Sequence, residues 1–546
     1  MKKLFIVFML MFTTWSSFAQ DRYVVFFKNK ANSPYQLSNP SAFLSQRAIE
    51  RRQRMNIPMD SADLPVNPQY VSGVAATGAR ILNRSRWFNS AIVQADTNQI
   101  IAVGNLNYVH VYIKVFGENL HRTTTKKKFD EVSDAEPSAY RNNTLGNYGG
   151  AGNQTQMINA DLLHNAGYTG RNTVIAVIDA GFTNTNTHRA FDSLRAENRI
   201  LGTWDFSLNN ANVYGYSNHG TSVLSCMAAY VPDTMIGTAP HAKYYLLRSE
   251  EEATEYEVEE YNWAAAAEYA DSVGADIINS SLGYTEFDAK SQNHTYAEMN
   301  GNTAIVTLAA KKASSKGVLV VNSAGNSGND PWFHIGAPAD ADEVFTIGAV
   351  QSNRDIAGFS SRGPTSDNRT KPDVSAQGAP AYIARSSGGY GTGSGTSFSG
   401  PIIAGFSACA WELYKVNHPN ATPAQVKQWI KLFSDRATSP NNEYGFGIPD
   451  GAKLLLNANV ATNPTTPFKF YPNPNQGTLF VQVNDPAKNN WDLQISDMVG
   501  KVLYQQNFAT IDLLLGIELP KNISRGFYII SLQNGNTAHK QVFIRE

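Results

Sequence analysis

Residues 173–181, "TVIAVIDAG", form a near-continuous apolar run that ends in Asp179 and small residues. Similar runs, which end in or near Gly, Ser or Asn, recur at 242–249, 275–283, 317–326 and 343–350. Residues 258–274 and 303–317, between these runs, have helical character. Strands that are apolar throughout are typical of sheets buried on both faces. The alternation therefore predicts an α/β domain with a doubly covered parallel sheet over residues 146–458.

Functional groups in such a sheet lie beyond the carboxyl ends of the strands. The predicted strand ends carry Asp179, the segment Ser281, Leu282 and Gly283, and Asn326. We therefore expect a site at this edge of the sheet.

The stretch at 393–401, "GSGTSFSGP", precedes a long apolar segment. Its glycines permit close backbone approach, and a helix that follows would direct its positive end toward the same place. Because proline is tolerated only within a first helical turn, Pro401 predicts a helix that begins just before it. Ser397 is then a candidate nucleophile, and a hydroxyl-capped turn is the alternative interpretation.

A serine hydroxyl needs a base that takes its proton and a third group that orients the base. His219, in "SNHGTSV" at the start of a second small-residue helix, is the candidate base. Asp179 is the candidate orienting group. Each of these two residues alone is more typical of a structural role, but the chain order Asp179, His219, Ser397 is not that of the α/β-hydrolases.

With this order, the chain resembles the subtilisin-like serine proteases. The blocks that carry the resemblance are "VIDAGF", "NHGTSV", "NSSLGY", "NSAGNSG", "FSSRGP" and "GTSFSGP", in sequence over residues 177–401. The resemblance implies a subtilisin-type sheet and a catalytic triad. Ser397 would attack the peptide carbonyl, His219 would act as general base and then acid, and Asp179 would hold the tautomer of the imidazole.

The resemblance also implies two roles outside the triad. The side chain of Asn326 would donate to the developing oxyanion, together with the backbone N–H of Ser397. Ser281, Leu282 and Gly283 would pair with the substrate backbone as an added strand.

Two residues depart from the usual family pattern. Ala180 follows the aspartate, where a hydroxyl residue that can bond the carboxylate is common. Phe398 follows the nucleophile, where methionine is usual.

The flanking regions predict further domains. Residues 20–116 contain strand-like runs around a basic helix, a small α+β unit similar in layout to the inhibitory pro-domains of these proteases. Residues 117–145 are polar, include three lysines at 126–128, and predict an exposed linker that contains the self-processing site. A second linker covers 459–467. Residues 468–546 predict a β-sandwich that resembles the C-terminal sorting domain of the type IX secretion system.

The N-terminus, "MKKLFIVFMLMFTTWSSFAQ", predicts a secretory signal peptide at 1–19, because two lysines precede an apolar run that ends in small residues. No other stretch approaches the ~18 apolar residues of a membrane span, so we expect no integral anchor. The formal net charge of −1 gives no reason to expect nucleic acid as a partner. Cys226 and Cys409 are the chain's two cysteines. They could form one disulfide bridge or remain two buried free thiols, and the sequence favours neither.

The run at 249–261, "SEEEATEYEVEEY", follows the strand that in this family edges the non-primed subsites. Its Glu250, Glu251, Glu252 and Glu255 would favour a basic side chain two to four residues before the cut, and a solvated helix N-terminus is the alternative. The sequence shows no metal-binding motif, so we expect no metal at the site and no cofactor required for catalysis. Many relatives bind structural calcium, to which "PADADE" (338–343) could contribute, and a solvated acidic loop is the alternative interpretation.

The sequence thus predicts a secreted or surface-displayed serine endopeptidase, made as a zymogen, that cleaves proteins or peptides. Its sorting domain would engage the outer-membrane secretion machinery. A catalytically silent binding or adhesion protein on the same scaffold is the alternative class, and a narrow processing protease is a third.

Overall fold

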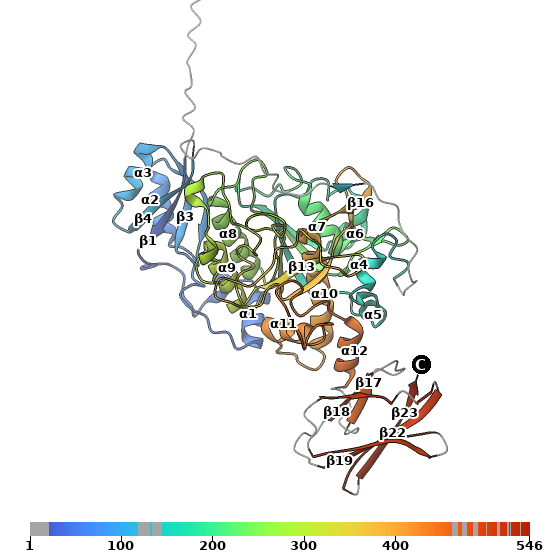
Figure 1. Ribbon diagram of the computed structural model, residues 1–546. Helices are drawn as coiled ribbons and strands as arrows, with labels where there is room; N and C mark the ends of the chain where they lie inside the picture. The colour runs from blue at the N-terminus through green and yellow to red at the C-terminus, as the bar shows by residue number, and fades with distance from the viewer. Residues whose placement is uncertain are drawn as a thin grey trace, which may run out of the picture.

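The computed structural model describes residues 21–117, 132–133, 145–460, 468–471, 478–483, 490–497, 500–509, 514–520, 523–524, 526–535 and 537–545. The predicted signal peptide lies outside these residues, as do most of the predicted linkers at 117–145 and 459–467. Figure 1 shows the chain as an N-terminal unit beside a central α/β domain, with a C-terminal β unit beyond it.

The central domain is built on a parallel sheet with the strand order β14-β13-β12-β11-β6-β10-β7. After β10 the chain crosses to the other side of β6, so β6 lies where the direction of strand addition reverses. Every residue of β6, β11 and β12 is buried, as their apolar sequences predict. The strands are β6 (Val174–Asp179), β7 (Ile200–Asp205), β10 (Lys243–Arg248), β11 (Ile277–Ser280), β12 (Leu319–Ser323), β13 (Phe345–Gln351) and β14 (Val374–Ala379).

Helices cover both faces of this sheet, because alternate residues of each strand point to opposite sides. Ala176 and Ile178 of β6 pack in one core with α8 (Val258–Ser272) and α9 (Ile305–Ser315). Val177 packs in the other core with α7 (His219–Ala228) and α10 (Thr396–Tyr414). The fold class is therefore confirmed as α/β with a doubly covered parallel sheet.

The remaining elements of the central domain are short or peripheral. They are α4 (Gly152–Gln156), α5 (Ala160–Asn165), α6 (Asp192–Ala196), α11 (Pro423–Leu432), α12 (Gly451–Val460), β5 (Val132–Ser133), β8 (Tyr230–Val231), β9 (Met235–Ile236), β15 (Ala381–Ala384) and β16 (Tyr390–Gly393). β5, which falls in the predicted linker, pairs antiparallel with β16.

The N-terminal unit is an antiparallel sheet in the order β2-β3-β1-β4, with helices on one face. Its other face packs on the central domain, where Val24 and Ile92 share a core with Tyr261 of α8. Figure 1 shows this blue unit beside α8 and α9. Its elements are β1 (Asp21–Phe27), α1 (Gln46–Arg54), α2 (Pro68–Ala76), β2 (Arg80–Ser85), β3 (Ser90–Ala95), α3 (Thr97–Gly104) and β4 (Val109–Phe116).

The C-terminal unit is all-β, as predicted. Its strands form two antiparallel sheets, β17-β18-β21 and β20-β19-β22-β23, which share one apolar core. The strands are β17 (Phe468–Tyr471), β18 (Thr478–Val483), β19 (Trp491–Asp497), β20 (Val502–Phe508), β21 (Leu514–Glu518), β22 (Gly526–Asn534) and β23 (Thr537–Arg545).

Cys226 and Cys409 are free thiols, and both are buried in the core of the central domain. Burial raises the pKa of each thiol well above its usual value. They therefore act as small apolar residues.

Candidate active site

The predicted site residues meet at one edge of the parallel sheet. Asp179 is the last residue of β6, Ser281 follows β11, and Asn326 lies three residues beyond the end of β12. These strands are neighbours in the sheet, and all of them run in the same direction. Their carboxyl ends therefore bring the three polar side chains to one place.

Asp179 and His219 form a buried pair. The Nδ1 atom of His219 lies 2.8 Å from Oδ1 of Asp179, and the two residues are 5% and 0% exposed. The imidazole ring of His219 lies close to the end of β6 because the next residue, Gly220, packs directly against the backbone of Gly181. A Cβ atom at position 220 would lie 2.4 Å from the carbonyl oxygen of Gly181. This geometry leaves Nε2 as the ring atom that can face a reacting group.

Ala180 changes how the carboxylate of Asp179 is held. Its backbone N–H donates to Oδ1 at 2.8 Å, whereas no donor among the described residues reaches the buried Oδ2. Because Ala180 has no hydroxyl to donate, its backbone N–H serves one oxygen of the carboxylate.

Ser397 lies in the first turn of α10, which begins at Thr396. The prediction that Pro401 belongs to the first turn is therefore wrong, because Pro401 lies inside the helix. A residue other than proline at that position would donate its N–H to the carbonyl of Ser397. The hydroxyl of Ser281 donates to that carbonyl instead, at 2.9 Å. A tertiary hydrogen bond thus lets the helix start early enough to include Ser397.

Asn326 is oriented by the residue that precedes Ser397. Its Oδ1 accepts hydrogen bonds from the backbone N–H and the hydroxyl of Thr396, both at 2.8 Å. The two donors fix which end of the amide is the carbonyl, so Nδ2 is directed the other way. The Asn326 amide is therefore set up as a donor.

A cavity of about 280 Å³ lies beside these groups. Ser397, Asn326 and the segment Ser281, Leu282 and Gly283 all line it. The predicted nucleophile, the predicted oxyanion donor and the predicted substrate-pairing segment thus share one hollow.

Phe398, the residue that follows the cavity-lining Ser397, packs against the ring of His219. The ring of Phe398 is 1% exposed, and its centroid lies 6.3 Å from that of the His219 ring. Its far edge fills the space where a Cβ at Gly393 would be. The phenylalanine therefore forms an apolar floor between α7, α10 and β16.

Part of the acidic run at 249–261 also lines the cavity. Glu250, Glu252 and Glu255 do so, but Glu251 does not. Glu251 forms an ion pair with Arg22 of the N-terminal unit at 2.5 Å, and although burial opposes it, this pairing lowers the pKa of Glu251. The prediction that Glu251 favours a basic substrate side chain therefore has to be corrected, because Glu251 pairs with Arg22 of the N-terminal unit.

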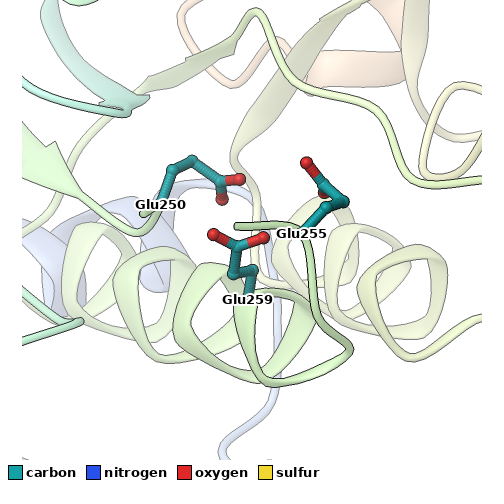
Figure 2. Close-up of side chains that lie close together, drawn as sticks. All are labelled: Glu250, Glu255 and Glu259. Carbon is teal, nitrogen blue, oxygen red and sulfur yellow. The ribbon is translucent and has the colours of Figure 1, made fainter. Parts of the chain in front are cut away.

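Figure 2 shows Glu250, Glu255 and Glu259, whose oxygens lie within 4.8 Å of one another. Glu259 accepts the backbone N–H groups of Glu251 and Tyr256, at 2.6 and 3.3 Å. One oxygen of Glu250 accepts the Tyr284 hydroxyl at 2.5 Å. The cluster thus holds the loop at 251–256 in place, and we assign no metal to it.

The other sequence candidate for a cation, residues 338–343, contains Asp340. This side chain is buried and accepts hydrogen bonds from the Thr307 hydroxyl and the Gly301 N–H, both at 2.7 Å. Burial raises the pKa of Asp340, and each of its two oxygens accepts a protein donor. Asp340 therefore braces the start of α9.

Sequence reasoning missed several residues of the cavity. Thr396 could have been found from "GTS", since its hydroxyl is adjacent to the nucleophile. The others, Glu286, Asp288, Trp332 and His334, come from two loops that carry no motif. Their place depends on how those loops pack.

Comparisons with known proteins agree with this geometry. Residues 170–447, about half of the chain, match the subtilase family model. Subtilisin E of Bacillus subtilis (strain 168) is 32% identical over 308 residues, which are 56% of this chain and 69% of that protein. The subtilisin of Bacillus pumilus is 32% identical over 308 residues, 96% of its own length and 56% of this chain. The chain belongs to the subtilase family. It is a subtilisin-like serine endopeptidase.

Both flanks match family models as well. Residues 22–131 match the peptidase S8 propeptide domain of Bacteroidota, so we call the N-terminal unit the pro-domain from here on. Residues 469–546 match the secretion system C-terminal sorting domain. The protein is therefore made with a propeptide and is exported, to the cell surface or beyond it. Its implied partners are protein substrates and the secretion machinery.

Among the described residues, none of the helices combines the length and the apolar character that a membrane-spanning segment needs.

Proposed function

We propose that this subtilase hydrolyses peptide bonds through Asp179, His219 and Ser397, with an acyl-enzyme intermediate. The observation that carries the proposal is the buried pair of Asp179 and His219 beside a cavity lined by Ser397. A serine attacks a carbonyl only when a positioned base removes its proton, and the Asp179 carboxylate fixes the tautomer of such a base.

The first step is attack by Oγ of Ser397 as His219 Nε2 takes its proton. The imidazolium that forms lies against Asp179, in a site where burial strengthens their attraction. The same proton then goes to the leaving amine, which departs and leaves an ester on Ser397. Water activated by His219 hydrolyses this ester and restores the enzyme.

Negative charge develops on the carbonyl oxygen in both halves of the reaction. We propose that Nδ2 of Asn326 and the N–H of Ser397, at the positive end of α10, receive it. Thr396 supports the proposal, because it holds the carbonyl end of the amide through two hydrogen bonds. Ser281, Leu282 and Gly283 would bind the substrate backbone on the neighbouring wall.

None of these steps is assigned to a metal or a cofactor. We propose that the side chains of the triad and the amide donors carry the reaction, and that any bound calcium would act on stability alone. Activity of the processed enzyme that persists after dialysis against a chelator would support this, provided that the enzyme remains folded.

We further propose the order of events before activity. The signal peptide at 1–19 directs export across the inner membrane, and the pro-domain at 20–116 covers the enzyme. Cleavage within 117–145 separates it from the catalytic domain at 146–458. The linker at 459–467 and the domain at 468–546 then serve passage through the outer-membrane type IX machinery.

The test is a Ser397→Ala chain expressed in a host that lacks other secreted proteases. It should accumulate as a precursor that retains the pro-domain, whereas the wild-type chain should be processed. Ser399→Ala is the matched control, because it removes a neighbouring hydroxyl that bonds within α10. Normal processing of the Ser397→Ala chain would show that the proposed nucleophile is wrong.

A further inference from the structure

The cavity beside Ser397 is lined by side chains of one charge. The described residues that line it include no lysine and no arginine. Its carboxylates are Glu250, Glu252, Glu255, Glu286 and Asp288, which we call the acidic wall. A hollow lined by one sign of charge and walled by protein concentrates ligands of the opposite sign.

Two loops hold the acidic wall in place. The N–H of Asp288 donates to the carbonyl of Glu255 at 2.8 Å, and the N–H of Glu255 donates to the Asp288 carboxylate at 3.2 Å. Glu252 and Glu286 remain exposed at the surface of these loops. The wall is therefore a fixed part of the cavity, and its outer members are accessible to a ligand.

The described residues place two points of the chain, one before and one after 118–131, near the catalytic domain's cavity and near β16. At the end of β4, the ring of Phe116 packs edge-on against Tyr256, 4.8 Å between centroids, in the loop that carries Glu252 and Glu255. Val132–Ser133 then pairs with Thr392 and Gly393 of β16, which ends just before Ser397. A chain that joins these two places has its amino-terminal part at the acidic wall and its carboxyl-terminal part at β16.

The sequence between these places contains the lysines at 126–128, which precede Val132 by four to six residues. Extended chain spans about 3.3–3.6 Å per residue, so these lysines can reach about 13–22 Å from β16. Binding of these lysines at the acidic wall requires that this reach bring them to it.

We propose that the acidic wall selects peptides that carry lysine or arginine on the amino-terminal side of the cleaved bond. The lysines at 126–128 are the first such peptide, supplied by the precursor for its own processing. This inference rests on the proposed function, since it assigns the substrate class of the same site. It replaces the interpretation of these lysines as part of a solvated linker.

The test compares two synthetic peptides that span residues 122–136, one with the three lysines and one with norleucine in their place. Norleucine keeps the aliphatic stem and removes the charge. For the purified processed enzyme, we expect kcat/KM to be about tenfold higher for the lysine peptide, the size expected for several exposed charge pairs acting together. Product masses should place the cut on the carboxyl side of the lysines.

Glu252→Gln and Glu286→Gln should each lower this preference about two- to threefold. Glu343→Gln is the matched control, because Glu343 is an exposed carboxylate that does not line the cavity. A charge exchange provides a second readout. Glu252→Lys with Glu286→Lys should slow processing of the precursor, and glutamates at 126–128 should restore it.

The outcomes separate this inference from the function on which it rests. Equal cleavage of the two peptides, or a cut before the lysines, would overturn the inference and leave the protease intact. A preference that Glu252→Gln and Glu286→Gln do not change would overturn the role of the acidic wall. Failure to cleave either peptide would overturn the proposed function, and the inference with it.

Discussion

The catalytic domain presents two acidic surfaces that differ in how their charge is compensated. Where the pro-domain docks, Asp271 at the end of α8 is fully buried and accepts from Arg51, Arg52 and Arg86. The cavity that carries the acidic wall, in contrast, is lined by no lysine and no arginine among the described residues. The first surface has its cations built into the pro-domain, and we propose that the second binds cations of a substrate.

The network around Asp271 continues into both partners. Lys316, at the end of α9, pairs with Asp60 and Asp63 of the pro-domain at 3.0 and 2.9 Å, and Arg52 also pairs with Asp63 at 2.8 Å. Removing one member of such a network leaves buried charges without a partner. The docking surface is therefore specific for the pro-domain, whereas exposed carboxylates in a cavity accept many cationic ligands weakly.

The largest expected effect comes from breaking the docking surface. Asp271→Ala leaves Arg51, Arg52 and Arg86 buried without their shared acceptor, at a cost of about 3–5 kcal/mol. We expect the pro-domain, once cleaved, to bind several hundred-fold more weakly. Gel filtration of the processed protein measures this as loss of co-elution.

The melting temperature of the released catalytic domain is the control for folding. Because Arg51, Arg52 and Arg86 leave with the pro-domain, the substitution should change that temperature little. Co-elution that matches the wild-type protein would show that the buried network does not hold the pro-domain.

An intermediate effect is expected from pH, through Glu268 of α8. Its carboxylate accepts the N–H groups of Arg86 and Trp87 at 2.7 and 3.2 Å, and burial raises its pKa to about 7. The released state, where Glu268 meets water, has an ordinary pKa of about 4.3. The docked state therefore holds the proton more tightly, so docking is favoured below the released pKa and weakens as pH rises toward 7.

We expect at least about a tenfold loss of pro-domain affinity between pH 5 and about 8 from this group. Glu268→Gln should flatten the dependence, and Glu343→Gln should not. The Arg22 ion pair lowers the pKa of Glu251, so this acid makes docking stronger as pH rises. That opposite effect is confined to pH values near and below the ordinary pKa of a glutamate, which lie outside this pH interval. Affinity that rises with pH over this interval would contradict the assignment.

The smallest effect separates the two surfaces by their response to salt. Salt screens exposed charges strongly and buried pairs little. Raising the ionic strength to about 1 M should reduce the preference for the lysine peptide about two- to fivefold, while co-elution of the pro-domain changes little. A docking affinity that falls as steeply as the peptide preference would show that the two surfaces are electrostatically alike.

The parts of this molecule that were predictable from sequence are those where local pattern and tertiary environment agree. β6, β11 and β12 were found because each is buried along its whole length, so its apolar residues are consecutive and do not alternate with polar ones. β7 was missed because it lies at the edge of the sheet and most of its residues are only partly buried, which weakens the pattern.

In the candidate site, the motif residues were predictable and their supports were not. Asp179, His219 and Ser397 stand in recognisable blocks, and the structure brings Asp179 and His219 into contact. The early start of α10 depends on the Ser281 hydroxyl, a contact 116 residues away in the sequence. The contribution of Glu286 and Asp288 to the acidic wall likewise depends on two loops that pair, which no local pattern encodes.

The central claim is that Ser397 is a nucleophile activated by His219, and labelling with a fluorophosphonate probe tests it most directly. The probe should form an adduct with processed wild-type enzyme, and peptide mapping should locate it on Ser397. His219→Ala should abolish labelling, because the base that removes the hydroxyl proton is lost, whereas His334→Ala should not. An adduct on another serine, or active processed enzyme that takes up no probe, would contradict the account.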